Sequence, residues 1–218
     1  MPDLGKGKGD ADFYFVSADD PEQAVTRIVD LVANRIPRRF CFDPIKDIQV
    51  LCPMNRGGVG ARSLNIELQA ALNPAGAKKV ERFGWIFAPG DKVMQIANDY
   101  EKDIYNGDIG MIEDVDVDEE ELAVDFEGRM VAFAFGELDT LVPAYAATIH
   151  KSQGSEYPAV VIPVMTQHYA MLQRNLIYTG ITRGKKLVVL LGQKKAVAIA
   201  VKNVSGRQRW SKLDEWLT

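Results

Sequence analysis

The sequence predicts an α/β fold in which a parallel sheet, with helices on both faces, is interrupted by a small antiparallel β insertion. Apolar strands alternate with amphipathic helical segments in the N-terminal and C-terminal parts of the chain. Between about residues 83 and 141, short alternating segments separated by turn residues replace that pattern. The chain of 218 residues is long enough to bury a core without disulfides or metal ions.

The N-terminal part predicts two strands and two helices. The Asp-Asp-Pro sequence at 19–21 supplies a helix cap and a first turn, and Pro37 should end that helix. A glycine-rich turn precedes the second helix, which Asn73 and Pro74 should end. The expected elements are a strand at 12–18, a helix from 21 to Pro37, a strand at 47–53, a turn at 57–60 and a helix up to 72.

The middle segment predicts a small SH3-like barrel of about five short strands. The large side chains of Val131, Phe133 and Phe135 face one way, with small alanines between them. Closing the sheet buries these side chains most effectively in so short a segment. Turn signals stand at 89–91, 106–108 and 127–128, and the Asn-Gly pair at 106 is the strongest hairpin signal. We therefore expect three parts, at 1–82, 83–141 and 142–218.

After Leu141 the alternation of helices and buried strands returns. These strands are apolar along their length, which is typical of parallel strands covered on both faces. The expected elements are a short helix within 145–157, a strand at 158–164, a helix at 174–184 that glycine ends, a strand at 186–192 and a helix at 194–203.

Composition limits the classes of function. A net charge of −4 argues against a free-standing nucleic-acid binder, but many acidic residues lie at 113–127, so the rest of the chain is closer to neutral and leaves room for a local binding groove. Cys41 and Cys52 lie in or beside apolar runs without ligand spacing, which predicts buried, reduced thiols. No targeting segment is visible, and no run approaches the roughly 20 apolar residues of a spanning helix, so we expect a soluble, cytoplasmic protein.

One polar run, Thr148 to Glu156 (TIHKSQGSE), collects hydroxyl, imidazole, amine, amide and carboxylate groups beside a buried strand. A polar helix face with a cap is the plain structural explanation. A hydrolase would need Ser152 within reach of His150, but positions two apart on a helix point to roughly opposite sides, and no G-x-S-x-G turn is present. The run instead offers donors that suit phosphate oxygens.

Two arginines are further candidates. Arg183 ends a helix just before Gly184, where a cation contributes a few tenths to about 1 kcal/mol without any function. Arg56 follows a parallel strand at its carboxyl end, where ligands bind in such sheets, although a tight connection is the alternative. No G-x-x-x-x-G-K-[ST] occurs, GKGKGD at 5–10 being only superficially similar, and no strand ends in an Asp-Glu pair. Alone, the chain should not hydrolyse ATP.

In combination, four segments resemble the C-terminal motor domain of RecD-like superfamily 1 DNA helicases, the family of the exodeoxyribonuclease V alpha subunit. The resemblance covers nearly the whole chain. Residues 53–69 resemble motif IV, 87–110 the start of an inserted barrel, 147–156 motif V and 175–192 motif VI. It implies the second RecA-like domain of a P-loop NTPase-type motor, from which a first such domain is missing, so we expect a fragment of a longer protein.

The resemblance also implies roles for single residues. ATP and Mg²⁺ would be held mainly by the missing domain, Arg183 would be the arginine finger, and Arg56 would sense the γ-phosphate. The remaining candidates follow from the same resemblance: Glu156, Gly154, Gln153 and Lys151 on the nucleotide side of motif V, and Thr148, His150, Ser152, Asn98 and Tyr100 on the DNA side. For Tyr100, a place in the barrel core is an equally open alternative. No metal site is expected in the chain itself.

The implied activity is ATP-dependent translocation on single-stranded DNA, 5′ to 3′, in recombination or repair. The partners would be single-stranded DNA and the missing domain, while further exodeoxyribonuclease subunits stay open. Two alternatives remain. A conjugation relaxase-helicase would need an upstream histidine-rich metal site, which these residues lack, and a non-enzymatic module would bind a peptide in an aromatic groove of the barrel.

Overall fold

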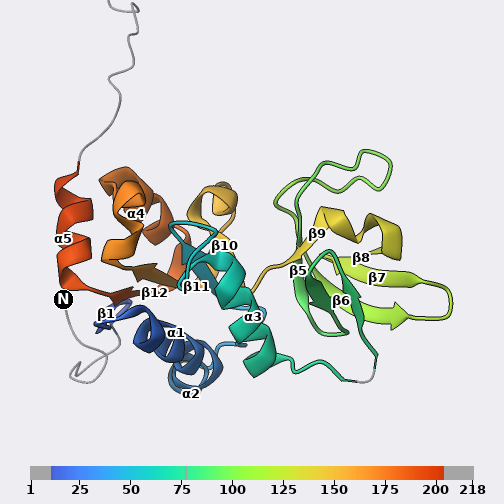
Figure 1. Cartoon of the computed structure of the whole chain (residues 1–218), viewed down its shortest axis with the longest axis horizontal. Helices are drawn as coiled ribbons and strands as arrows, with labels where there is room; N and C mark the ends of the chain where they lie inside the picture. The colour runs from blue at the N-terminus through green and yellow to red at the C-terminus, as the bar shows by residue number, and fades with distance from the viewer. Residues whose placement is uncertain (1–10, 77, 204–218) are drawn as a thin grey trace, which may run out of the picture.

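The computed structural model describes residues 11–76 and 78–203, which form two bodies (Figure 1). One is a five-stranded parallel sheet with helices, and the other is an antiparallel β structure inserted between helix α3 and strand β10. The predicted fold class is confirmed. The division at 82/83 and 141/142 stays a proposal, since the antiparallel strands begin at Val80 and end at Pro143. Among the described residues, no helix is long and apolar enough to cross a membrane.

The parallel sheet has the strand order β1-β12-β11-β2-β10, and all neighbouring strands run in the same direction. Its strands are β1 (Phe13–Ser17), β2 (Ile48–Cys52), β10 (Ala146–Thr148), β11 (Tyr157–Val164) and β12 (Gly184–Gly192). Four of them coincide with predicted strands. The sequence did not predict β10, because Ala-Ala-Thr carries no readable strand pattern.

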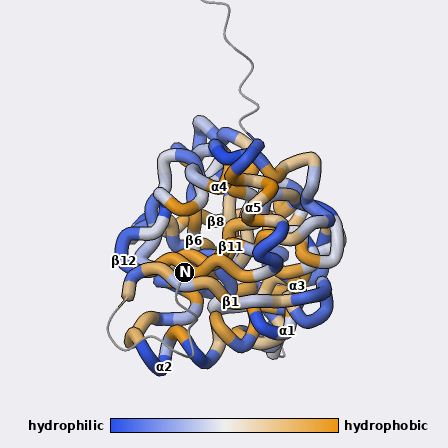
Figure 2. Tube along the Cα trace, turned by 90° about the vertical axis from the view of Figure 1, so that its left-hand side faces the viewer, coloured by the Kyte–Doolittle hydropathy of each residue, from blue (hydrophilic) through white to orange (hydrophobic). Residues whose placement is uncertain are grey.

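Successive residues of each central strand enter different cores on the two faces of the sheet. On β11, Ala159 and Val161 pack in the core under α1 to α3, whereas Val160 and Ile162 pack in the core under α4 and α5. The helices are α1 (Pro21–Asp30), α2 (Ile36–Phe40), α3 (Ala61–Leu72), α4 (Arg174–Ile181) and α5 (Lys194–Lys202). Figure 1 shows α1 and α2 on one side of the sheet and α4 on the other, and Figure 2 shows hydrophobic residues along the central strands.

The first helical run does not end at Pro37, so that prediction was wrong. Asp20 caps α1 as expected, its side chain accepting a hydrogen bond of 2.8 Å from the backbone N–H of Gln23. The run then continues through a π-helical turn, Leu31–Arg35, into α2, where Pro37 stands in the first turn. At the start of a helical segment the N–H that proline lacks is not needed, so the chain stays helical up to Phe40.

Two smaller predictions also need correction. Cys41 is exposed in a left-handed conformation with φ 56°, so only Cys52 is the buried thiol that the sequence predicted. Burial raises the pKa of Cys52.

Helix α4 ends at Ile181 rather than at a glycine, because Gly184 already begins β12. An added Cβ at Gly184 would lie 2.7 Å from a side-chain atom of Val188, so close packing explains this glycine.

The insertion consists of a hairpin and a five-stranded antiparallel sheet of order β8-β7-β6-β5-β9. The strands are β3 (Val80–Arg82), β4 (Trp85–Phe87), β5 (Lys92–Gln95), β6 (Ile109–Asp116), β7 (Glu121–Phe126), β8 (Arg129–Ala134) and β9 (Leu141–Pro143). Val131, Phe133 and Phe135 are buried in its core, as predicted. The turn at 127–128 joins β7 to β8 with positive φ at both residues. The Asn-Gly pair at 106 forms no such hairpin, because a longer loop, 96–108, joins β5 to β6.

Asp91, between β4 and β5, ties the base of the insertion to the parallel sheet. It is fully buried, and four groups donate hydrogen bonds to its carboxylate. The donors are the side chains of Gln69 (2.6 Å) and Asn73 (2.7 Å), the backbone N–H of Ala88 (2.8 Å) and the hydroxyl of Tyr145 (2.7 Å). Burial raises the pKa of Asp91, and these hydrogen bonds act against that rise. The Asp91 carboxylate therefore links helix α3 and the residue after it to Ala88, near the start of the insertion, and to Tyr145, just after its last strand.

Asn65 of α3 lies against the outer edge of β10. Its side chain is buried, its Oδ1 accepts from the backbone N–H of Ala146 at 2.7 Å, and its Nδ2 donates to the carbonyl of the same residue at 2.8 Å. The side-chain amide thus satisfies both backbone groups that a neighbouring strand would otherwise pair. From β2, Gln49 adds a hydrogen bond of 2.9 Å to the carbonyl of Ala144.

Candidate functional site

The polar run 148–156 extends from the carboxyl ends of the parallel strands to their amino ends. We call these two sides of the sheet the carboxyl edge and the amino edge. Thr148 ends β10 level with the last residue of β2. On β11, Ala159 pairs with Ile48, the first residue of β2, and Tyr157 begins β11 two residues earlier. Because the strands are parallel, Thr148 lies at the carboxyl edge and Glu156 near the amino edge. A contiguous sequence motif is therefore divided between two surfaces.

The middle of this run is a short 3-10 turn, η3 (Ile149–Ser152). Ser152 is fully buried, and its hydroxyl donates to the carbonyl of Ile149 at 2.8 Å, so it faces the protein and not a ligand. His150 and Lys151 are exposed. Partial desolvation of the amine lowers the pKa of Lys151. Of these candidates, the structure leaves only the histidine and the lysine accessible.

The turn that follows reaches the amino edge of the sheet. Gln153 and Gly154 are exposed, and φ +91° at Gly154 is a conformation that favours glycine. The Glu156 side chain is 54% exposed, and its Oε2 lies 3.1 Å from Nζ of Lys185 at the start of β12. An exposed ion pair of this kind contributes little to stability, so the carboxylate can exchange partners at small cost.

Arg183 lies beside the same turn, between α4 and β12. Its guanidinium donates three hydrogen bonds, to the carbonyl of Ser155 (3.1 Å), the carbonyl of Thr179 (3.3 Å) and the hydroxyl of Thr182 (3.3 Å). Its own carbonyl accepts from the N–H of Tyr157 at 2.8 Å. In the part of the chain that the structure describes, no carboxylate lies within ion-pair distance of this half-buried side chain. The acceptors of these three guanidinium hydrogen bonds are all neutral oxygens.

Arg56 lies at the other edge of the sheet. It is exposed and follows the carboxyl end of β2, whereas Arg183 precedes the amino end of β12. The structure therefore does not bring the two arginines together. An added Cβ at Gly60 would lie 2.6 Å from the carbonyl oxygens of Asn55 and Arg56, so a tight connection into α3 accounts for this glycine.

A cleft of about 660 Å³ separates the insertion from the amino edge of the parallel sheet. Gly154 and Glu156 line one wall, and the turn between β7 and β8, with Arg129, lines the other. Lys92 also lines the cleft but is almost fully buried, and its Nζ donates to the carbonyl of Ile45 at 2.9 Å. Burial lowers the pKa of Lys92 to about 8. Of the nucleotide candidates in the polar run, Gly154 and Glu156 thus line an open, charged cleft, and Lys151 and Gln153 lie outside its lining.

The candidates in the insertion lie on the 96–108 loop. Tyr100 is 77% exposed, which decides between the two predicted alternatives in favour of the surface. Asn98 is also exposed, and its Nδ2 lies 3.3 Å from the Tyr100 hydroxyl. The ring of Tyr105 stands edge-on to that of Tyr100, with centroids 6.1 Å apart. Exposed aromatic rings of this kind suit base stacking.

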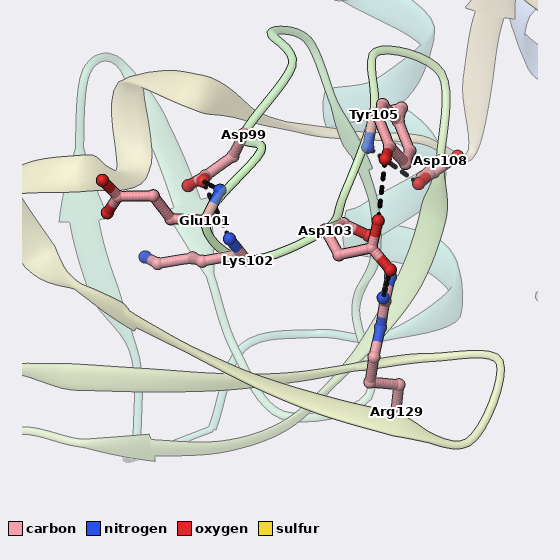
Figure 3. Close-up of polar contacts among 7 residues, drawn as sticks. All are labelled: Asp99, Glu101, Lys102, Asp103, Tyr105, Asp108 and Arg129. Atoms are coloured by element: carbon pink, nitrogen blue, oxygen red, sulfur yellow. Dashed lines mark hydrogen bonds and ion pairs between the residues drawn. The ribbon is translucent and has the colours of Figure 1, made fainter.

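Carboxylates hold this loop in shape (Figure 3). Asp99 accepts from two following backbone N–H groups at 3.0 Å, and Asp108 accepts from the backbone N–H of Tyr105 at 2.8 Å. Asp103 accepts from the Tyr105 hydroxyl at 2.7 Å and from Nη1 of Arg129 at 2.8 Å. These hydrogen bonds lower the pKa of Asp103, and the carboxylate raises the pKa of Tyr105. Tyr105 and the backbone of the loop are therefore held by hydrogen bonds within the insertion itself.

The two groups of candidates meet where the loop approaches η3. A Cβ added at Gly107 would lie 3.9 Å from the carbonyl of Lys151, so the two segments are side by side. Sequence reasoning missed Tyr105, Arg129 and Ser155. The first two could only be found once the loop was folded, and the third acts through its backbone, which no residue type reveals. In the described ranges, no group of acidic, histidine and cysteine side chains is arranged to hold a metal ion.

Comparison with known proteins defines the class of this chain. Residues 64–126 match the family described as the ATP-dependent RecD-like DNA helicase SH3 domain, and residues 143–191 match the UvrD-like helicase C-terminal domain. A crystal structure of Pif1 helicase from Bacteroides in complex with ADP-AlF3 and ssDNA covers 76% of this chain and 45% of its own, with a TM-score of 0.52 and 17% identity. At that identity the likeness concerns the fold alone. The fold and the matched domains are those of a helicase C-terminal region.

Curated relatives identify the family. The chain is 40% identical over 162 residues to the ATP-dependent RecD2 DNA helicase of Deinococcus radiodurans, covering 74% of this chain and 22% of that helicase. It is 29% identical over 196 residues to the RecBCD enzyme subunit RecD of Mycolicibacterium smegmatis, covering 87% of this chain and 34% of that subunit. The chain thus spans between a fifth and about a third of these relatives. It belongs to the RecD-like superfamily 1 DNA helicases, as part of their C-terminal region.

Proposed function

We propose that this chain completes the ATP site of a RecD-like helicase and contacts the single-stranded DNA along which that helicase moves. The observation that carries the proposal is the meeting of Arg183 with the turn that ends at Glu156, at one edge of the sheet. Two separate connections, α4 to β12 and β10 to β11, bring these groups together. An arginine and a carboxylate at one edge suit a nucleotide bound between this region and a second domain.

The chemistry of Arg183 fits the role of an arginine finger. Its guanidinium is held by neutral oxygens, so it can exchange those hydrogen bonds for stronger, charge-assisted bonds to phosphate oxygens. Such an arginine neutralises charge that develops on the transferred phosphoryl group, an effect of about 10³ to 10⁵ in rate. Glu156 would accept from the nucleotide ribose, with Lys151, Gln153 and Gly154 forming the turn around it.

The proposal assigns the phosphate-binding loop and the Mg²⁺ ligands to a first RecA-like domain, because this sequence contains no such loop. ATP supplies the free energy of translocation. On its own, the described region would then be inactive. Arg56 lies at the opposite edge of the sheet, and we do not include it in this site.

Single-stranded DNA would pass the carboxyl edge. His150 and Thr148 would contact its backbone, and Asn98 and Tyr100 would border its path on the insertion. Buried Ser152 would support the turn from within. The proposal includes 5′ to 3′ movement in DNA recombination or repair in the cytoplasm, with further exodeoxyribonuclease subunits as candidate partners.

The test is single-strand-stimulated ATP hydrolysis by the full-length protein that carries this sequence. We expect Arg183→Ala to lower hydrolysis by about 10²-fold or more while nucleotide and DNA binding are retained. Arg174→Ala, at the other end of α4, is the matched control and should hydrolyse ATP normally, because Arg174 contacts the backbone of α5 and lies away from the turn at 153–156. If Arg183→Ala hydrolyses ATP like wild type, Arg183 has only a structural role at the end of α4, and the proposed ATP site is refuted.

A further inference from the structure

The β3–β4 hairpin presents an aromatic tip that the proposed function does not use. Arg82 pairs with Trp85, so Phe83 and Gly84 form a two-residue turn with φ 52° and 75°. Positive φ at both positions defines a type I′ turn, for which Asn-Gly is the preferred sequence. For a bulky residue such as phenylalanine this conformation is strained. Phe83 is also 55% exposed, so its side chain adds little to the core of the insertion.

Two guanidinium groups lie near the tip of the hairpin. Arg62 of α3 lies over the Trp85 ring at 5.2 Å, and its Nη2 would be 3.4 Å from a Cβ added at Gly84. Arg82 lies over the Phe135 ring at 5.7 Å. Both arginines are exposed, and within 11–76 and 78–203 neither has a carboxylate within ion-pair distance. Each is held by an aromatic face, which leaves its charge free for a ligand.

The charge around the tip is positive although the whole chain is not. The net charge of the chain is −4, but the segment 78–87 contains three basic residues and one acidic residue, Glu81. Lys78 forms an ion pair of 2.9 Å with Asp114 of strand β6. The tip therefore combines an exposed ring with unpaired cations on an otherwise acidic molecule, and that surface is complementary to a polyanion with flat bases.

We propose that the tip of the β3–β4 hairpin is a second contact for single-stranded DNA, in which a base stacks on Phe83 and backbone phosphates lie against Arg62 and Arg82. Aromatic stacking next to cationic groups is how proteins hold single strands without reading their sequence. An acidic protein segment would use the arginines but would give the strained phenylalanine no particular role. The proposal adds a contact to the proposed function and does not depend on Arg183.

The position of the tip allows one strand to reach both this contact and the 96–108 loop. The 3-10 turn η2 (Phe135–Thr140) lies between them. Arg82 contacts it at Phe135, and Lys102 of the loop pairs with its Glu137 at 2.6 Å. A strand bound along the loop would have to be extended past η2 to meet Phe83. The second contact should therefore appear only with longer oligonucleotides.

The decisive variant is Phe83→Asn, because Asn-Gly fits the turn better than Phe-Gly and removes only the ring. We would measure the affinity of this chain for labelled oligothymidines of increasing length. Short oligonucleotides should bind wild type and Phe83→Asn equally, whereas long ones should bind the variant about 5-fold or more weakly. Phe83→Trp should restore the affinity for long oligonucleotides. The matched control is Tyr169→Asn, which removes another ring, 70% exposed, from a different surface and should change nothing.

A second measurement tests the arginines. Arg62→Gln and Arg82→Gln should each reduce the salt dependence of binding to long oligonucleotides, by about one phosphate contact. Equal binding of every length by wild type and Phe83→Asn overturns the proposal, as does a chain that binds no oligothymidine. So does a tip variant that loses binding to an acidic peptide and keeps its affinity for DNA. Because hydrolysis by Arg183→Ala is measured separately, failure of the tip and failure of the proposed ATP site remain distinguishable.

Discussion

Replacing Tyr145 by phenylalanine removes one hydroxyl from the junction between the insertion and the parallel sheet. That residue is 3% exposed, and its hydroxyl donates to Asp91 at 2.7 Å. A hydrogen bond to a charged group contributes about 1.5–3 kcal/mol, and phenylalanine leaves no cavity because the ring is retained. We expect the free energy of unfolding to fall by that amount. For a chain of this size, the melting temperature should fall by roughly 3–12 °C.

The assay is urea unfolding at pH 7, with calorimetry for the melting temperature. Tyr100→Phe is the matched control, because its hydroxyl is at the surface and its loss should change the unfolding free energy by less than about 0.5 kcal/mol. A double-mutant cycle with Asp91→Ala should show strong non-additivity, since that substitution removes the carboxylate that accepts this hydrogen bond. If Tyr145→Phe unfolds like wild type, the carboxylate does not hold the insertion in the way we describe.

Two further results are expected. The pKa of Lys92 is lowered to about 8 by burial, below its value of 10.5 in the unfolded chain. Above pH 8 the folded protein loses this proton first, so the unfolded state binds more protons and the unfolding free energy should rise with pH, by up to about 1.4 kcal/mol per unit. Lys92→Met should abolish that rise in urea titrations between pH 7 and 10, and a rise of the same size in the variant would point to other groups. For the thiols, Cys41 is exposed and Cys52 is buried with a raised pKa, so a disulfide reagent should label native protein at Cys41 alone. Rapid labelling of Cys52 would show that the sheet opens far more readily than its burial implies.

The strands of the parallel sheet were predictable because their signal is local. A strand buried on both faces is a short run of apolar, often branched residues, as 187–191 is, and the length of the run favours a strand over a helix. The exceptions follow from context. The three residues of β10 owe their strand conformation to β2 and to Asn65, and Pro37 is accommodated in the first turn of α2, after a π-helical turn.

The sequence allowed us to predict which residues belong to the candidate site, but not where each of them lies on the folded protein. The run 148–156 was found by its polar character, yet its ends lie at opposite edges of the sheet. No spacing in the sequence reveals that Ser152 turns inward or that Arg56 and Arg183 lie apart. The tip of the β3–β4 hairpin carried only a weak signal, the glycine after Phe83, and its strain is visible only in the backbone angles.

The amide of Asn65 has a consequence for the behaviour of the protein in solution. An open sheet edge is a template on which a second chain can add a strand, and proteins that expose one tend to associate. Here the backbone groups of Ala146 that face outward from β10 are already occupied by a side chain from the same molecule. A single asparagine thus takes the place of a sixth strand, and this part of the sheet edge offers no free hydrogen bonds to a neighbouring molecule.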